Sequence, residues 1–455
     1  MLSHSPGADA IAFGHAPSLG EAALSAPAVA LLAALLLLGI AHGIYWLAAL
    51  YQIERTRRVL PTARAGIALA REREPVGHVC VIVPAHNEAH AIASLVRSVL
   101  AQSHAHITLV LALDRCTDNT AQVARDAAKG DPRLVLHEIA HCPPDWAGKV
   151  HAIWSAATTT EAARSADFLL FADADTTFDP ECVRATLALL DRRELGMLSL
   201  LSTLTHDRWF EKVAQVAAGS ELLRQFPLVR SNLRSGRRAF ANGQFMLFRA
   251  ETYRALGGHE AVRDELLEDM AFARLMAQRA KTEPAMAQGV LLADTMIHCR
   301  MYDSFAAFKK GWKRIYVESL NRRTSRLFAY GWRLRLFGAL ISIASFLTTL
   351  VLTSLVLVTQ VLVQTEASAA IESSAARPQA DPLLLATLLT NALASAAFLL
   401  ATARMHATSH APLRWSVSYP VGAWIVGGVL IEGARDLRRG TPTEWAGKSY
   451  VRPPR

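Results

Sequence analysis

Two aspartates stand one residue apart directly after an apolar run. They are Asp173 and Asp175 in FADADTTF, residues 171–178. Alternate residues of an extended segment point the same way, so both carboxylates could reach one cation at the end of a strand. Mg²⁺ and Mn²⁺ prefer oxygen ligands and commonly bridge protein carboxylates to phosphate oxygens. The pair indicates a metal–diphosphate site; the alternative is two solvated turn carboxylates.

Polar side chains also follow the other short apolar runs of the same region. HVCVIVPA ends before Asn87 and Glu88, and ITLVLAL ends at Asp114. Apolar runs bounded by turn residues are typical of buried parallel strands, and ligands bind at the carboxyl ends of such strands. We therefore expect residues 76–300 to form an α/β domain with a doubly wound, mostly parallel sheet.

Several motifs recur in a fixed order along this domain. They are VIVPAHNE (81–88), ALDRCTDNT (112–120), AGKVHAI (147–153), FADADTTF, ANGQFMLFRAETYRALGGH (241–259) and LLEDMAFA (266–273). Together they resemble the family 2 glycosyltransferases over roughly residues 78–315, which implies the A-type nucleotide-sugar glycosyltransferase fold. The pattern NGQFMLFR…GGHEAVRDE…EDMAFAR, followed by RMYDSF…GW, resembles the bacterial membrane branch, whose members include carotenoid and hopanoid-associated lipid glycosyltransferases.

The resemblance implies a binding site for a nucleotide-sugar donor. Its residues would be Pro84, Ala85, Asn87, Glu88, Asp114, Lys149 and Asp173, with Asp173 and Asp175 holding Mg²⁺ or Mn²⁺. Many members have two adjacent aspartates where this chain has Leu113–Asp114. The identity of the donor's nucleobase therefore stays undetermined. A lysine at position 149 suits a diphosphate on charge grounds; the alternative is an ordinary surface lysine.

Glu268 and Asp269 match the Glu-Asp pair of the family, in which the aspartate is the catalytic base. In an inverting transfer the acceptor hydroxyl loses a proton as it attacks the anomeric carbon, so a carboxylate must lie within reach. The pair also opens the stretch MAFARLMAQRA, where a helix dipole favours acidic residues. Both roles can hold together.

The sequence departs from the family at a motif that closes over donor and acceptor. Many membrane members carry Gln-x-x-Arg-Trp there, whereas this chain reads FKKGWKRIY. Trp312 and Arg314 are the candidates for the role of this motif, and they would contact the acceptor. Processive polysaccharide synthases normally have the full motif, so we expect a non-processive enzyme.

Apolar runs near both ends predict transmembrane helices. A tail, residues 1–27, has no Lys or Arg and precedes an apolar run at 28–51, which is long enough to span a bilayer. Four arginines follow at positions 55, 57, 58 and 64. By the positive-inside rule the N-terminus faces outside and the catalytic domain the cytosol. We expect a multi-pass protein of the cytoplasmic (inner) membrane.

The C-terminal part predicts further contact with the membrane. Residues 301–335 alternate basic and aromatic side chains, as interfacial helices do. Residues 336–433 hold apolar runs for two to three spans, and the tail 434–455 is basic. Three full spans would place that basic tail outside, so one C-terminal run could be re-entrant or interfacial instead.

Composition excludes some functions. The net charge is +9, but Arg and Lys cluster beside the apolar runs and no nucleic-acid-binding motif occurs, so no nucleic-acid partner is expected. The five cysteines are scattered and lack C-x-x-C spacing, which argues against a disulfide framework or a structural zinc site. The oligomeric state stays open.

These observations favour a metal-dependent, inverting glycosyltransferase with a lipid acceptor. A close alternative is transfer to polyprenyl phosphate or to a polysaccharide. A non-catalytic membrane scaffold is a third reading; loss of Asp173, Asp175 or Asp269 would mark it, and all three are present.

The first prediction concerns topology. A cysteine introduced between residues 60 and 70 should resist an impermeant thiol reagent in sealed cells, because the arginines beside it hold that segment inside. It should label once the cells are opened. Ready labelling in intact cells would overturn the assignment.

Overall fold

The computed structural model describes residues 24–233, 239–369, 381–445, 448–451 and 453–454. Most of the predicted N-terminal tail and positions 446, 447, 452 and 455 of the basic tail lie outside the described residues. The chain forms two compact units. The helical unit comprises residues 1–44 and 344–395, and the α/β unit comprises residues 45–343 and 396–455.

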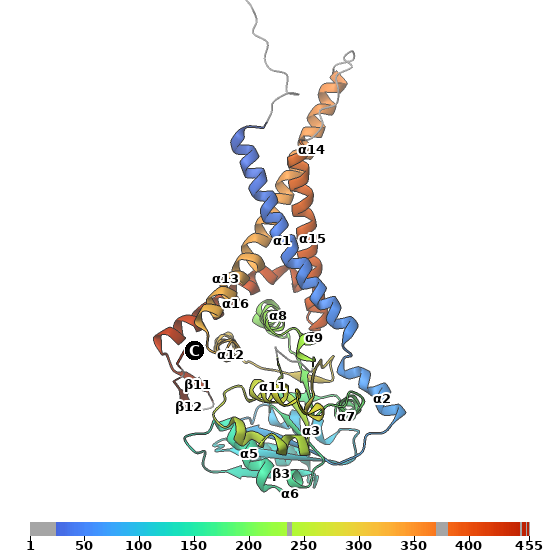
Figure 1. Cartoon of the computed structure of the whole chain (residues 1–455), viewed down its shortest axis with the longest axis vertical. Helices are drawn as coiled ribbons and strands as arrows, with labels where there is room; N and C mark the ends of the chain where they lie inside the picture. Colours follow the sequence, from blue (N-terminus) through green and yellow to red (C-terminus); the bar gives the residue numbers. More distant parts are fainter. Residues whose placement is uncertain (1–23, 234–238, 370–380, 446–447, 452, 455) are drawn as a thin grey trace, which may run out of the picture. The chain divides into compact units, whose positions relative to one another are not determined.

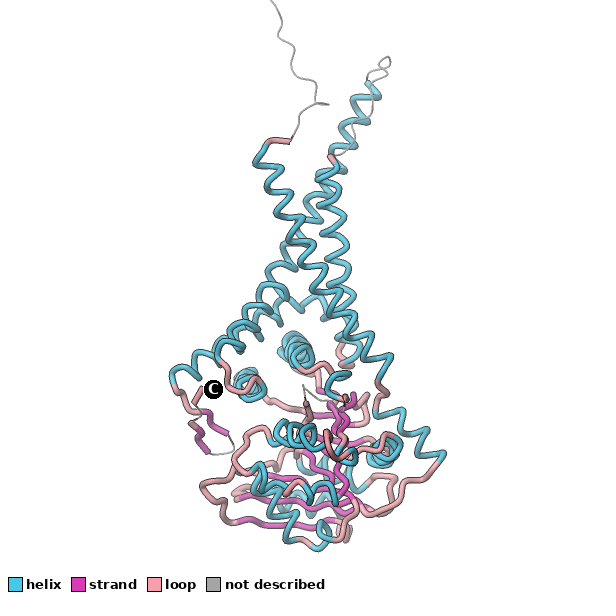
Figure 2. The backbone as a smooth tube through the Cα atoms, viewed as in Figure 1, coloured by secondary structure: helices cyan, strands magenta, loops and turns pink. Residues whose placement is uncertain are grey.

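A seven-stranded sheet organises the α/β unit (Figure 2). Its strands, in sheet order, are β3 (Leu134–Ile139), β2 (Ile107–Asp114), β1 (Val79–Ala85), β4 (Phe168–Ala172), β8 (Phe245–Arg249), β6 (Met197–Leu201) and β9 (Gln288–Leu292). Neighbouring strands run parallel except on both sides of β8. The mostly parallel α/β sheet is confirmed, and its order reverses between β1 and β4.

Alternate residues of β1 are buried on opposite faces of this sheet. Val79, Val81 and Val83 pack in one core with α3 (Ile92–Leu100), α4 (Thr120–Ala128) and α7 (Cys182–Arg192). Cys80 and Ile82 pack in another with α5 (Gly148–Thr159), α10 (Ala250–Ala255) and α11 (Glu268–Arg279). Figure 1 labels α3, α5, α7 and α11. Helices on both faces make the sheet doubly wound, as predicted.

A small second sheet lies next to the two aspartates. It orders β5 (Thr176–Phe178), β10 (Ile297–Cys299) and β7 (Thr203–Leu204), with Cys299 opposite Thr176. The remaining short elements are α2 (Gly66–Glu72), α6 (Glu161–Arg164), α8 (Val216–Gln225), α9 (Leu228–Ser231) and the hairpin β11 (Thr443–Trp445) with β12 (Lys448–Tyr450).

The predicted interfacial region forms α12 (Phe305–Ser319) and α13 (Thr324–Arg335), but its aromatic face does not match the expectation. Phe308, Trp312 and Tyr316 recur every four residues and are buried in the core of the α/β unit. Side chains four apart share one helix face, so the stripe packs inside rather than at a headgroup layer. On the same helix Lys313 pairs with carboxylates of α16 (Tyr419–Arg439).

Four described helical segments are long and apolar enough to cross a membrane: Ala26–Glu72, Thr324–Leu362, Pro382–Thr408 and Leu413–Arg439. The first contains α1 (Ala26–Val59), the second runs from α13 into α14 (Ile341–Ala369), and the third is α15 (Pro382–Thr408). In the last, 56% of the most apolar stretch is buried inside the protein. Its helix, α16, packs on α12 and α13, which fits the re-entrant or interfacial alternative better than a free span.

Candidate active site

The carboxyl ends of β1, β2 and β4 open into one cavity of about 420 Å³ within the α/β unit. Of the residues expected from the sequence, those that line it are Pro84, Ala85, Glu88, Asp114, Lys149, Asp173, Asp175, Glu268, Asp269, Trp312 and Arg314. Segments spread over more than two hundred residues therefore meet at the switch point of the sheet, where ligands bind in folds of this kind.

Lys149 is at the centre of the polar end of the cavity. Its Nζ lies 2.7 Å from Asp173 Oδ1 and 2.6 Å from Glu268 Oε1. Burial acts to lower the pKa of Lys149, but the two carboxylates outweigh it and raise the pKa. The same lysine holds the pKa of the buried Glu268 below its usual value. The lysine is therefore not a surface residue: it joins the start of α5, the end of β4 and the start of α11.

Asp269 is held by the backbone. Its Oδ2 accepts a hydrogen bond from the Gly243 N–H at 2.8 Å, and its Oδ1 accepts one from the Met270 N–H at 2.7 Å. Burial and the neighbouring Glu268 raise the pKa of Asp269 to about 6. A carboxylate with this pKa is ionised near neutral pH, yet it is a stronger base than an exposed aspartate.

Gly243 makes this close approach possible. A Cβ at that position would lie 3.2 Å from both Lys149 Nζ and Glu268 Oε1, and 3.4 Å from Asp269 Oδ2. A side chain would therefore be tight against Lys149 and Glu268, which would have to shift by a few tenths of an ångström, and would be in ordinary contact with Asp269. The limited space explains why residue 243, between Asn242 and Gln244, is a glycine.

Asp173 and Asp175 lie in a tight turn between β4 and β5 rather than in extended chain, because the Thr176 N–H and hydroxyl donate to the Asp173 carbonyl oxygen. Within the described part of the chain, the buried Asp175 Oδ1 has no hydrogen-bond partner within normal geometry, although the Cys299 thiol lies near enough to interact with the Asp175 carboxyl. Burial, then Asp173 and Glu88, raise the pKa of Asp175. An unpartnered, crowded carboxylate oxygen fits a cation. Among the described residues no group of three or more His, Cys, Asp or Glu could hold a metal, so ligand oxygens would have to complete its shell.

Two residues expected to bind the nucleoside also make contacts within the protein. Asn87, at a left-handed φ of 59°, accepts from the Thr117 N–H at 2.8 Å and ties together the loops after β1 and β2. It is not among the residues that line the cavity. Asp114 lines the cavity, but both its oxygens accept from Arg115, at 2.8 and 2.6 Å. A nucleobase bound here would therefore contact an Asp–Arg pair rather than a free carboxylate.

Trp312 and Arg314 reach the cavity from α12. The Trp312 side chain is buried, and its indole N–H has no hydrogen-bond partner among the described residues. One guanidinium nitrogen of Arg314 donates to the Leu266 carbonyl oxygen at 2.9 Å. Arg314 thus anchors the loop that precedes Glu268 and Asp269, a positioning role that its sequence spacing did not reveal.

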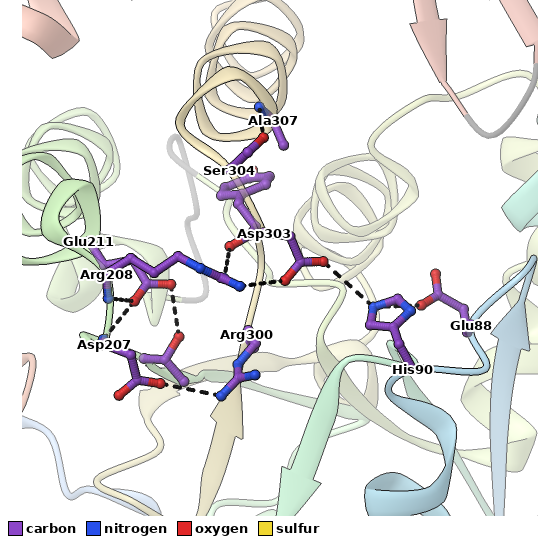
Figure 3. Close-up of polar contacts among 11 residues, drawn as sticks. Glu88, His90, Asp207, Arg208, Glu211, Arg300, Asp303, Ser304 and Ala307 are labelled. Carbon is purple, nitrogen blue, oxygen red and sulfur yellow. Dashed lines mark hydrogen bonds and ion pairs between the residues drawn. The ribbon is translucent and has the colours of Figure 1, made fainter.

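A charged network that sequence reasoning missed borders the same site. Figure 3 shows His90, 3.8 Å from both Glu88 and Asp303, and Arg208, which binds Asp303 at 3.0 Å. Arg208 also donates to the Tyr302 carbonyl oxygen at 2.7 Å. The network joins the loop after β1 to the segment that begins α12. No short motif marks it, because its members are far apart in the sequence.

The cavity does not end at the polar groups. It extends to the cytosolic end predicted for the first apolar helix, where Ala49, Gln52 and Ile53 of α1 and Met405 of α15 line it. All of these residues belong to the α/β unit. No motif in α1 indicates that it forms part of the site, because its apolar residues predict only a membrane span.

Comparison with known protein families identifies a match for the catalytic region. A family model described as glycosyltransferase-like family 2 matches residues 75–327, more than half of the chain. No curated protein matches the sequence.

Solved structures with similar folds were also found. The mannosyltransferase PcManGT from Pyrobaculum calidifontis, in complex with GDP-Man and Mn²⁺, is 18% identical over 88% of this chain and 98% of that chain, with a TM-score of 0.44. Glucosyl-3-phosphoglycerate synthase from Mycobacterium tuberculosis, with Mn²⁺ and uridine diphosphate, is 16% identical over 58% of this chain and 84% of that chain, with a TM-score of 0.37.

A stability prediction follows from the position of Lys149. Lys149→Met leaves Glu268 buried without its cation, so we expect the free energy of unfolding to fall by about 3 kcal/mol, the low end for a broken buried pair because Lys149 is partly exposed. Urea unfolding of the purified chain measures this. Lys281→Met, at an exposed lysine, is the control and should change stability by less than about 0.5 kcal/mol. Adding Glu268→Gln to Lys149→Met should restore most of the loss; a double variant as unstable as the single one would contradict the pairing.

Proposed function

The chain belongs to glycosyltransferase-like family 2, and from that premise we propose that it transfers a sugar from a nucleotide sugar to a lipid acceptor, with inversion at the anomeric carbon. One observation carries the lipid part of the proposal. The cavity that holds Asp173 and Asp269 is also lined by Gln52 and Ile53 of the first apolar helix. An acceptor could thus reach the charged groups from the membrane side. The sequence pattern favours the membrane branch that modifies terpenoid lipids, and a cytosolic catalytic domain in the cytoplasmic membrane.

The donor would occupy the polar end of the cavity. Asp173 and Asp175 would hold Mg²⁺ or Mn²⁺ together with oxygens of the donor diphosphate. The metal, when bound, stabilises the negative charge that develops on the leaving nucleoside diphosphate. Lys149 lies beside Asp173 and adds a positive charge on the protein side, close to where that diphosphate would sit.

Asp269 would act on the acceptor. Its carboxylate takes the proton of the acceptor hydroxyl while the hydroxyl oxygen bonds to the anomeric carbon and the bond to the diphosphate breaks. The two backbone N–H groups that bind Asp269 keep it oriented. Glu268 stays ionised against Lys149, so its main effect is to position the lysine and to keep the pKa of Asp269 high.

Metal dependence tests the donor half of the proposal. Sugar transfer by membranes should disappear in EDTA and return with Mg²⁺ or Mn²⁺. Asp173 and Asp175 are themselves negative, so a bound metal cation is needed to stabilise the charge of the leaving diphosphate. The assay uses a panel of labelled nucleotide sugars and counts label in extracted lipid. Full turnover in chelator, with metal content verified as nil, would exclude this mechanism.

Removal of the base tests the acceptor half. Asp269→Asn should lower kcat by roughly a hundredfold or more, the range usual for a lost general base, and leave nucleotide affinity nearly unchanged. In the unsubstituted enzyme kcat/KM should fall about tenfold per pH unit below pH 6, because the carboxylate becomes protonated below its raised pKa of about 6. Asp264→Asn, at an exposed aspartate, controls for the chemical change. Near-normal turnover of Asp269→Asn would assign the base to another group.

The buried indole of Trp312 gives a third test. Trp312→Phe keeps an aromatic ring and removes the unpartnered N–H, so we expect the KM for the lipid acceptor to rise about two- to tenfold, the value of one neutral hydrogen bond. Trp312→Ala should have a larger effect of the same kind. Nucleotide titration should be largely unaffected. If either variant abolished donor binding and left the acceptor KM unchanged, Trp312 would belong to the donor pocket.

A further inference from the structure

Arg224 is a cavity-lining cation for which the described residues supply no hydrogen-bond or ion-pair partner. The other cavity-lining Lys and Arg side chains are each held by a protein group: Arg57 by Glu54, Lys149 by Asp173 and Glu268, and Arg314 by the Leu266 carbonyl. Arg224, on α8, also lines the cavity. Among the described residues it makes no hydrogen bond or ion pair with a carboxylate, and its guanidinium carbon lies 4.1 Å from the centre of the Tyr45 ring.

The surroundings of Arg224 leave its charge uncompensated. Glu221, one helical turn earlier, is fully buried and binds Arg333 of α13 at 2.5 Å. Two arginines therefore share the neighbourhood of one carboxylate, and Tyr45 is in electrostatic contact with all three groups. The net charge of this cluster is positive. An arginine whose guanidinium is stacked on a ring keeps its donors in a fixed plane, which suits two-point binding of a phosphate.

The location specifies where such a phosphate would come from. Tyr45 lies on α1, inside the apolar run of the first predicted span, and the next turns of the same helix bring Ala49, Gln52 and Ile53 to the cavity wall. Lys149, Asp173 and Asp175 come to the same cavity from other segments, α5 and the turn after β4. Basic side chains at the end of a membrane span meet lipid headgroups. The donor diphosphate has its own cations at the other end.

We propose that Arg224 forms a subsite for a phosphate group on the acceptor lipid, so that the acceptor is a lipid with both a phosphate and a free hydroxyl. This rests on the proposed function. The phosphate is a binding handle and does not react. The hydroxyl oxygen forms the bond to the anomeric carbon, its proton goes to Asp269, and the sugar–diphosphate bond breaks. Arg224 and Asp269 line the same cavity and act on the two groups of one lipid.

The test compares a lipid that carries a phosphate with one that carries none. Phosphatidylglycerol carries a phosphodiester and free hydroxyls, and diacylglycerol with the same acyl chains carries a hydroxyl without phosphate. Each is titrated into the purified full chain in neutral detergent and its binding followed by native mass spectrometry. We expect phosphatidylglycerol to bind at least about tenfold more tightly, and Arg224→Gln to remove about ten- to a hundredfold of its affinity, the value of a charge-assisted contact.

Control variants separate the charge from the fold. Arg224→Lys keeps the charge but loses the planar two-point contact, so it should keep only part of the preference, and Arg230→Gln, at an exposed arginine of the neighbouring α9, should leave it unchanged. Nucleotide affinity should stay the same in all three variants. Equal binding of the two lipids, or a preference that survives Arg224→Gln, would overturn the subsite. A fall in nucleotide affinity in Arg224→Gln would assign the arginine to the donor and equally overturn it.

Transfer assays distinguish this proposal from the broader one. Metal-dependent transfer to diacylglycerol but not to phosphatidylglycerol would leave the glycosyltransferase function intact and contradict the phosphate subsite. Transfer to a polyprenyl phosphate that persists in Asp269→Asn would make the phosphate the nucleophile and contradict it as well. Transfer to phosphatidylglycerol that depends on Arg224 would support it. Absence of nucleotide-sugar turnover with every acceptor would count against the proposed function, while the lipid-binding comparison would still decide the subsite.

Discussion

The double ion pair of Lys149 is the interaction on which the polar end of the site depends. It neutralises Glu268, which is almost fully buried, and an isolated buried carboxylate would be too costly to keep ionised. Because the lysine also binds Asp173, it fixes the turn that carries Asp173 and Asp175 relative to the start of α11. Asp269 then sits beside an ionised neighbour, and this is one reason why its pKa lies above that of an ordinary aspartate.

The cavity is organised by charge from one end to the other. Carboxylates and one lysine occupy the end at the strand termini, and Arg224 stands at the wall formed by α8 and α1. Apolar residues such as Leu223, Leu228 and Phe240 line the space as well. A substrate with a polar head and an apolar body fits this gradient better than a sugar polymer does. The buried α12, which carries Trp312 and Arg314, forms another part of the wall.

Much of the fold could be predicted from the sequence, because local patterns determine it. The apolar runs of β1, β2 and β4 end in polar residues, and that pattern alone predicts a parallel sheet with a site at its edge. A motif and the chemistry of proton removal predict Glu268 and Asp269 as site residues, and both line the cavity. The stripe of Phe308, Trp312 and Tyr316 is buried in the core, whereas the sequence pattern predicts an interfacial helix. The basic residues between the three aromatic residues make their four-residue period difficult to recognise.

Other features could not be predicted, because they arise from contacts between distant segments. Arg115 donates hydrogen bonds to both carboxylate oxygens of Asp114. The sequence alone does not indicate that these two adjacent residues pair in this way. The roles of Arg314 and Arg224 depend on Leu266 and Tyr45, which only the folded chain brings near them.

The central claim is an in-line displacement in which Asp269 deprotonates the acceptor. The anomeric configuration of the sugar in the extracted lipid product, read from its NMR coupling constants, tests this most directly. The account predicts a configuration opposite to that of the nucleotide-sugar donor. A product that retains the configuration of the donor would contradict a single displacement and with it the role given to Asp269.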